Sequence, residues 1–156
     1  MANWLNFIRA KPSLPYNEFP KILIKDSNEG VFEFDNDKVY LVNIWSTSCA
    51  PCIKKFPDYE KLFLQYKDDP SIEVVTLNLP FSNDYMSSMQ YTKSYDFTAL
   101  SATKKSSWKN LSVKAVPLYI VLGKENKIAY HGQLNLKWYE FYNNIHKVIE
   151  HEKNKN

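Results

Sequence analysis

The order of apolar and polar residues along the chain predicts an alternation of strands and helices. Residues 38–45 are mostly apolar without clean alternation, which is typical of a central strand buried on both faces. Apolar side chains at helical spacing over residues 53–66 predict an amphipathic helix, and residues 72–79 predict a second strand. A strand, a helix and a strand of these lengths predict a parallel crossover. Pro57 falls inside the helix and is expected to kink it.

Hairpins are predicted on both sides of this crossover. Residues 19–34 alternate around a polar turn, which predicts an N-terminal β-hairpin at the edge of the sheet. Residues 118–122 and 127–131 have the β-branched and aromatic composition of a second hairpin. Apolar residues recur at helical spacing over 138–149, so we expect a terminal helix there.

The stretch between the second strand and the second hairpin has a weaker pattern. Asn83 and Asp84 can cap a helix that runs to about Tyr95. A short strand is expected at 97–100 and a short helix at 103–111, which carries Trp108.

Together these elements predict one α/β domain over residues 1–156, with a mixed central sheet flanked by helices. A chain of 156 residues can bury roughly 68–70% of its unfolded surface, so it needs no disulfide staple to fold. Residues 1–18 are expected to form an N-terminal arm that packs on the domain. Residues 151–156 are polar, and we expect a frayed tail there.

Charge and hydropathy exclude several classes of protein. The net charge of +3 comes from 20 basic and 17 acidic residues spread along the chain, so no dense basic stripe predicts binding to nucleic acid. No stretch approaches the ~18 apolar residues of a membrane span. The N-terminus also lacks the pattern of a signal peptide. The chain is therefore expected to be either cytoplasmic or an exported protein whose targeting segment has been removed.

Candidate chemistry enters with the only two cysteines, Cys49 and Cys52, which open the predicted helix directly after the buried strand. Unpaired N–H groups at a helix start, with Lys54 and Lys55 nearby, favour the thiolate and lower the pKa of Cys49 below the ~8.5 of a free cysteine. Cys49 would attack a substrate disulfide, and Cys52 would resolve the mixed disulfide. Pro51 is compatible with the first helical turn, where its missing N–H is not needed.

Other readings of the cysteine pair stay open. Zinc needs four ligands, and His131, His146 and His151 lie far along the chain, so no metal site is expected. A static disulfide or two inert core thiols would also satisfy the pattern. We prefer the redox interpretation because a buried strand and a helix flank the motif, and it needs no cofactor beyond the dithiol itself.

A further candidate follows from the predicted topology. In a parallel crossover, the loop after the second strand emerges at the same edge of the sheet as Cys49. Phe81 in that loop is therefore a candidate wall of the site.

The sequence W-S-T-S-C-A-P-C, followed much later by Val116-Pro117 before a hairpin and a terminal helix, resembles the thioredoxin fold. The resemblance covers nearly the whole chain. It is strongest to the TlpA/ResA-like branch of the AhpC/TSA-type thioredoxin-like proteins. The F-P-x-x-x-x-x-D-S-x-x-G-x-x-x-F hairpin, L-V-N-I-W in the strand, and F-P soon after Cys52 are similar to that branch. The long stretch from Cys52 to Pro117 leaves room for the central insertion of the branch.

The resemblance implies a set of contacts and a setting. Val116-Pro117 would be a cis peptide facing the dithiol, with the Val116 backbone pairing with bound substrate. Trp45, Ala50 and Pro51 would complete the substrate-binding surface. Relatives usually act outside the cytoplasm on protein thiols and disulfides and draw electrons from an upstream donor, which implies a periplasmic or other extracytoplasmic location.

Three residues depart from the family pattern. Ser48 stands where many relatives have Trp, Asn43 replaces the buried acid of ordinary thioredoxins, and Lys55 stands where several relatives have Glu. Asn43 can form hydrogen bonds but is no base at neutral pH, so water is the default proton acceptor for Cys52.

The sequence thus predicts a thiol-disulfide oxidoreductase that reduces disulfides of protein substrates through a mixed disulfide at Cys49. One alternative is a thiol peroxidase, which usually needs a Pro-Thr signature and a nearby Arg, whereas the only arginine here is Arg9. The other is a non-enzymatic thioredoxin-fold binding module.

Overall fold

The computed structural model describes residues 16–80, 85–103, 108–132 and 138–155. Its strands are β1 (Ile24–Asp26), β2 (Val31–Phe32), β3 (Val39–Trp45), β4 (Ile72–Asn78), β5 (Thr98–Ala102), β6 (Leu118–Leu122) and β7 (Ile128–Gly132). Its α-helices are α2 (Ala50–Lys54), α3 (Phe56–Tyr66), α4 (Tyr85–Thr92) and α6 (Trp138–Lys153), and the short 3₁₀ turns are η1 (Lys109–Leu111) and η2 (Lys124–Asn126). In these parts of the chain, no helix has the length and apolar character needed to cross a membrane.

All the described strands join one mixed sheet in the order β2-β1-β5-β4-β3-β6-β7. β3 pairs in parallel with β4 and antiparallel with β6, so the predicted parallel crossover and second hairpin are confirmed. β5 lies parallel to β4, and the N-terminal hairpin β1–β2 extends the sheet beyond it to the edge. The predicted α/β thioredoxin fold, with an N-terminal hairpin and a central insertion of α4 and β5, is confirmed.

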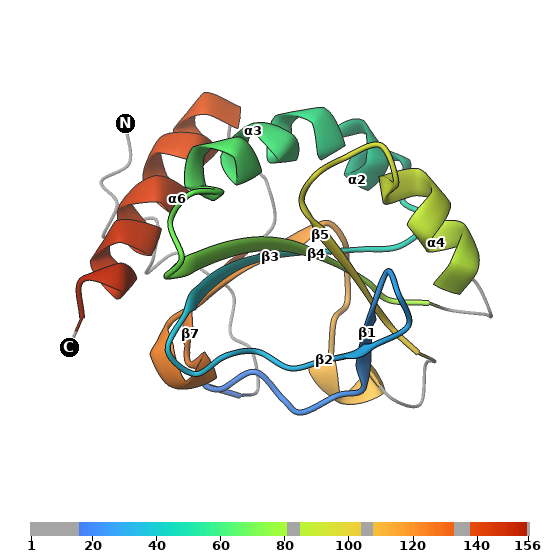
Figure 1. Cartoon of the computed structure of the whole chain (residues 1–156), viewed down its shortest axis with the longest axis horizontal. Coiled ribbons are helices and arrows are strands. Elements are labelled where there is room, and N and C mark those ends of the chain that lie inside the picture. Colours follow the sequence, from blue (N-terminus) through green and yellow to red (C-terminus); the bar gives the residue numbers. More distant parts are fainter. Residues whose placement is uncertain (1–15, 81–84, 104–107, 133–137, 156) are drawn as a thin grey trace.

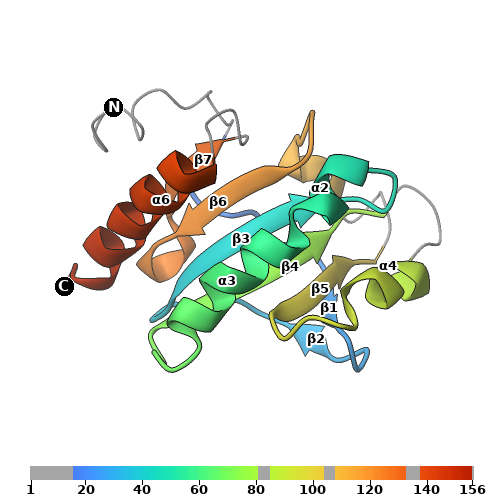
Figure 2. The same ribbon diagram turned by 90° about the horizontal axis from the view of Figure 1, so that it is seen from above.

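Helices α2, α3, α4 and α6 cover one face of the sheet (Figure 1), and Figure 2 shows α6 and α3 lying side by side across it. Alternate residues of β3 point to opposite faces, so Leu41 and Trp45 pack under the helices, whereas Val42 and Ile44 pack into a second core. The second core is closed by side chains from the segments outside the sheet, including Phe19, Trp108 and Leu111. Every residue of β3 is buried, as expected for a central strand.

The predicted helix over 53–66 is interrupted in the structure. α2 ends at Lys54, and α3 begins again at Phe56, so the predicted kink is a break at Lys55. Pro57 lies in the first turn of α3, where its missing N–H leaves no intrahelical bond unmade. The break lets α2 carry the cysteines while α3 follows the sheet.

One other helical prediction needs correction, and a second is described only in part. α4 ends at Thr92, not at about Tyr95, because the chain turns there and the Tyr95 N–H donates to the Thr92 carbonyl at 3.0 Å. Of the helix expected at 103–111, residues 104–107 lie outside the described residues. Trp108 is helical, and the 3₁₀ turn η1 follows it and is capped by Ser112, which has a positive φ of 52°. The expected cap at Asn83 and Asp84 lies outside the described residues.

The chain end is better ordered than predicted. α6 continues to Lys153, so the expected frayed tail from His151 is wrong for its first three residues. Glu152 is 7% exposed and pairs with Lys155 at 2.7 Å. Lys153 pairs with Asp69 at 2.6 Å, which fastens the end of α6 to the turn before β4.

Part of the N-terminal arm expected at 1–18 is described. Glu18 forms a β-bridge with Lys127, and the Asn17 carbonyl accepts a hydrogen bond from the Ile128 N–H at 2.8 Å. The Tyr16 hydroxyl donates to the Leu111 carbonyl at 2.6 Å. Residues 16–18 therefore pack against β7 and η1, and the rest of the arm lies outside the described residues.

Candidate active site

The two cysteines lie in a tight turn at the carboxyl end of β3. The Cys49 N–H donates to the Ser46 carbonyl at 3.0 Å, which turns the chain back over the sheet. Cys49 is the N-cap of α2, and its carbonyl accepts hydrogen bonds from the N–H groups of Cys52 and Ile53 at 3.1 and 3.3 Å. Proline in the first turn of α2 matches the predicted helix start.

Cys49 and Cys52 form a disulfide, with a Cα–Cα distance of 5.3 Å. Cys49 is 9% exposed and Cys52 is fully buried, so only Cys49 has access to the surface. The Cys49 Sγ also accepts a hydrogen bond from the Cys52 N–H at 3.2 Å. In the reduced protein, a donor at this position would stabilise negative charge on Cys49.

The segment before β6 reaches the same end of the sheet. The Val116-Pro117 peptide is cis, as the family resemblance implied. Val116 packs against both hydrophobic cores, one of which contains both cysteines. Ala50 and Pro51 follow Cys49 and are exposed. Because Leu118 at the start of β6 pairs with Ile44 near the end of β3, Val116 and Pro117 lie at the same end of the sheet as the disulfide.

Trp45 lies under this surface. It is 1% exposed and packs edge-to-face against Phe56, with ring centroids 4.9 Å apart. It also contacts Tyr91 of α4 at a centroid distance of 6.2 Å. Tyr91 is 45% exposed, so an aromatic ring from the central insertion flanks the motif. The local sequence pattern did not predict this contact, because it depends on how α4 packs against β3.

Asn43 is part of a buried polar row. It pairs across the sheet with Thr76 of β4 and Tyr119 of β6, and all three are fully buried under the helices. Their side-chain polar atoms have no hydrogen-bond partner among the described residues. Burial raises the pKa of Tyr119, so its hydroxyl stays protonated. The sequence flagged Asn43 alone, because the row depends on strand register.

Tyr59 of α3 is bonded to the backbone of the strands that carry this row. Its hydroxyl lies 2.6 Å from the Val75 carbonyl and 3.0 Å from the Leu41 carbonyl, so α3 is tied to β3 and β4. Burial raises the pKa of Tyr59 well above its usual value. Tyr59 is thus a neutral donor and no candidate base.

The other flagged residues lie farther from the chemistry. Lys55 pairs with Asp58 at 3.6 Å, whereas Lys54 is exposed. Phe81, the candidate wall of the site, lies outside the described residues.

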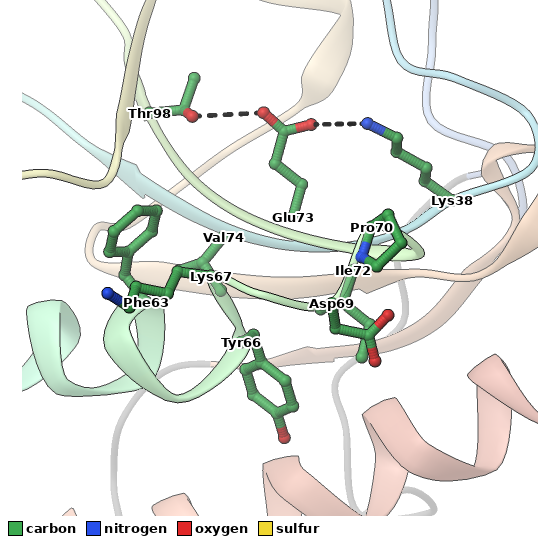
Figure 3. A pocket seen from close by; sticks show the side chains of 10 residues that line it. All are labelled: Lys38, Phe63, Tyr66, Lys67, Asp69, Pro70, Ile72, Glu73, Val74 and Thr98. Carbon is green, nitrogen blue, oxygen red and sulfur yellow. Dashed lines mark hydrogen bonds and ion pairs between the residues drawn. The ribbon is translucent and has the colours of Figure 1, made fainter.

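A hollow of about 240 Å³ lies at the opposite end of the sheet, where β4 begins. Figure 3 shows Glu73 at its rim, 3.7 Å from Lys38 and accepting a hydrogen bond from Thr98. These charges already pair with one another, and none of the residues lining the hollow belongs to the dithiol motif. The hollow is therefore separate from the candidate site.

Comparison with known proteins agrees with this geometry. Residues 36–128 match the thioredoxin-like protein family. The chain is 22% identical over 115 residues to the thiol-disulfide oxidoreductase ResA of Bacillus subtilis. The aligned residues cover 72% of this chain and 64% of ResA. The chain thus spans less than two thirds of the length of that relative.

Solved structures give the same fold. A putative thiol:disulfide interchange protein DsbE from Chlorobium tepidum superposes with a TM-score of 0.71 at 19% identity, over 88% of this chain and 99% of that one. StoA from Bacillus subtilis superposes with a TM-score of 0.63 at 16% identity, over 82% of this chain and 98% of StoA. The match of more than half the chain and the similarity to ResA confirm the resemblance stated from the motifs. The chain belongs to the thioredoxin-like family.

Proposed function

We propose that this chain is a thiol-disulfide oxidoreductase that reduces disulfides of protein substrates. The observation that carries the proposal is the asymmetry of the Cys49–Cys52 pair. Cys49, at the start of a helix, is 9% exposed, and Cys52, one turn further on, is fully buried. Such a pair can exchange with an external disulfide at one sulfur and close internally with the other.

The first step is attack by the Cys49 thiolate on one sulfur of the substrate disulfide. A bond forms between Cys49 Sγ and that sulfur, and the other substrate sulfur leaves as a thiolate. The Cys52 N–H, 3.2 Å from Cys49 Sγ, stabilises the attacking thiolate. Lys54, in the last turn of the same short helix, is exposed and adds a positive charge to this segment.

In the second step, Cys52 loses its proton and attacks Cys49 Sγ. The Cys49–Cys52 disulfide forms, and the second substrate sulfur leaves as a thiolate, so the protein loses two electrons and the substrate gains them. Asn43 is no base, and burial keeps the hydroxyls of Tyr59 and Tyr119 protonated. Water is therefore the proton acceptor in this proposal. A dithiol of an upstream donor returns the pair to its reduced form.

The substrate chain would lie across the exposed surface formed by Ala50, Pro51 and the Val116-Pro117 peptide. The Val116 backbone would hydrogen-bond to the substrate backbone, and Pro117 would pack against the disulfide. Trp45 is buried, so its part in binding would be to support this surface from beneath. Phe81 is retained as a proposed wall on the basis of the sequence.

We place this activity outside the cytoplasm, as the family resemblance implies. Separating the cell into fractions, with free thiols alkylated beforehand, and finding which fraction contains the protein tests this location. Recovery of the protein only from the cytoplasmic fraction would contradict it and favour the cytoplasmic alternative.

The central experiment compares Cys49→Ser with Cys52→Ser in a protein-disulfide reduction assay. Cys49→Ser is expected to abolish reduction, because no nucleophile reaches the surface. Cys52→Ser is expected to stop after the first step and accumulate a mixed disulfide at Cys49, visible by mass spectrometry and released by dithiothreitol. The two variants change the same atom type three residues apart, so each is the matched control of the other.

Two outcomes would overturn the proposal. Full reduction activity in Cys49→Ser would favour a non-enzymatic binding module. Peroxide consumption that depends on Cys49, without reduction of protein disulfides, would favour a thiol peroxidase.

A further inference from the structure

The two segments that supply the dithiol and the cis-proline carry positive charge only. Residues 39–57 contain Lys54 and Lys55, and residues 97–123 contain four lysines, with no Asp or Glu in either segment. The whole chain has 17 acidic residues against 20 basic ones, so this separation is not expected from composition. The acids of the chain are concentrated elsewhere.

Lys54 and Lys114 lie on the two segments that carry the dithiol and the cis-proline. Lys54 follows Cys52 by two residues and is exposed. Lys114 precedes Val116 by two residues and is also exposed. Val116 packs against the cluster containing both cysteines, and the views in Figures 1 and 2 show the chain leading into β6 rising beside α2. Two exposed lysines thus lie on the segments that meet at the dithiol end of the sheet.

Lys54 and Lys114 have no ion-pair partner among the described residues. Lys38, Lys127 and Lys153, at the opposite end of the sheet, each pair with an acid, at distances of 3.7, 3.2 and 2.6 Å. Near the dithiol, Asp58 is shared between Lys55 and Lys61, each at 3.6 Å. The charges of Lys54 and Lys114 are therefore not balanced by an ion pair in the part of the chain that the structure describes.

From this distribution we infer that the physiological substrate carries acidic side chains beside its disulfide, and that Lys54 and Lys114 determine this specificity. The inference rests on the proposed function. Complementary charge steers the encounter and fixes the register of two surfaces, and it penalises partners of like charge. Aspartate or glutamate next to the substrate cystine would meet Lys54 and Lys114 as its sulfur meets Cys49.

The test uses two disulfide-linked peptides with the same sequence except for the flanking residues, which are Asp and Glu in one and Lys in the other. We expect kcat/KM for reduction of the acidic peptide to exceed that of the basic peptide by about tenfold at low salt, because electrostatic steering acts on association. High salt is expected to reduce this ratio. The ratio of the two peptides cancels any change in the intrinsic reactivity of Cys49.

The double variant Lys54→Glu/Lys114→Glu is expected to reverse the preference. Its matched control is Lys21→Glu/Lys147→Glu, which makes the same change in net charge at exposed positions outside the two flanking segments and should keep the wild-type ratio. If wild-type protein reduces both peptides equally, the inference is overturned and the proposed function stands. If it reduces neither peptide, nor a neutral disulfide, the proposed function itself fails. The wild-type comparison decides these outcomes even if a variant does not fold.

Discussion

Asn43 is the residue whose environment departs most from what burial normally requires. It is fully buried, and neither polar atom of its amide has a hydrogen-bond partner among the described residues. The hydroxyl groups of Thr76 and Tyr119, on either side of Asn43, also have no hydrogen-bond partner among the described residues. Buried polar groups are normally paired, with protein or with ordered water. The position therefore tolerates a neutral amide and should not tolerate a charge.

Asn43→Asp tests this at the scale of one residue. Burial raises the pKa of a carboxyl group, so the folded variant prefers the protonated form. We expect the free energy of unfolding to fall by about 1–3 kcal/mol at neutral pH. The pKa of the introduced carboxyl group is raised in the folded variant. The loss of unfolding free energy is therefore full above that folded pKa, and it disappears as the pH falls below the unfolded pKa of ~3.9. Urea unfolding of the oxidised protein across this pH range measures the difference in unfolding free energy between the variant and the wild type.

Asn43→Leu is the control, since it has nearly the same size and no titrating group. Its difference from wild type should not vary with pH. A destabilisation by Asn43→Asp that is the same at every pH would contradict the account, because it would mean that the carboxylate is not desolvated.

At the scale of elements, the end of α6 is held by Asp69. Its carboxylate pairs with Lys153 at 2.6 Å and accepts hydrogen bonds from the Ser71 hydroxyl and N–H at 2.6 and 3.0 Å. The Lys153 and Ser71 bonds lower the pKa of Asp69 from 3.8 to about 2. Figure 3 shows the Asp69 side chain directed toward the terminal helix. This contact explains why α6 extends past the predicted end.

Lys153→Gln should lower the midpoint of urea unfolding slightly, since exposed ion pairs contribute little. The pKa of Asp69 is lower in the folded protein, so its stabilising effect is present above about pH 4 and is lost as pH falls toward 2. The difference between variant and wild type should disappear over the same range. Lys147→Gln, at an exposed position of the same helix, should show no such pH-dependent difference. A Lys153→Gln effect that persists at pH 2 would contradict this assignment.

At the scale of the whole molecule, one sheet joins two apolar cores. Leu62 of α3 is fully buried in the core under the helices, and Leu100 of β5 is 1% exposed in the core on the opposite face. Both cores include residues of β3, β4 and β6, so neither can open without disturbing strands of the other.

Leu62→Ala and Leu100→Ala should therefore each lower the free energy of unfolding by about 2–4 kcal/mol. Each variant should still unfold in one cooperative transition, and the double variant should show nearly the sum of the two losses. Circular dichroism and tryptophan fluorescence recorded during the same urea titration measure this. Two separate transitions, or different midpoints for the two signals, would show that the cores unfold independently.

Much of the fold and the site could be predicted because it depends on local patterns. The apolar run at 38–45 requires burial on both faces, and the helical spacing at 138–149 requires a helix with one buried face. The chemistry of Cys49 and Cys52 follows from their spacing and from the strand that precedes them. The cis state of Val116-Pro117 was implied by family resemblance, because local sequence favours trans for most X-Pro bonds.

The remaining features come from contacts between residues far apart in the sequence. Strand register places Thr76 and Tyr119 beside Asn43, and helix packing brings Tyr91 onto Trp45. The sequence by itself determined the elements and the reactive pair, since periodicity and thiol chemistry act over a few residues. The tertiary structure decided which neighbours each group has and where α2 and α3 separate, because these depend on how the strands and helices pack together.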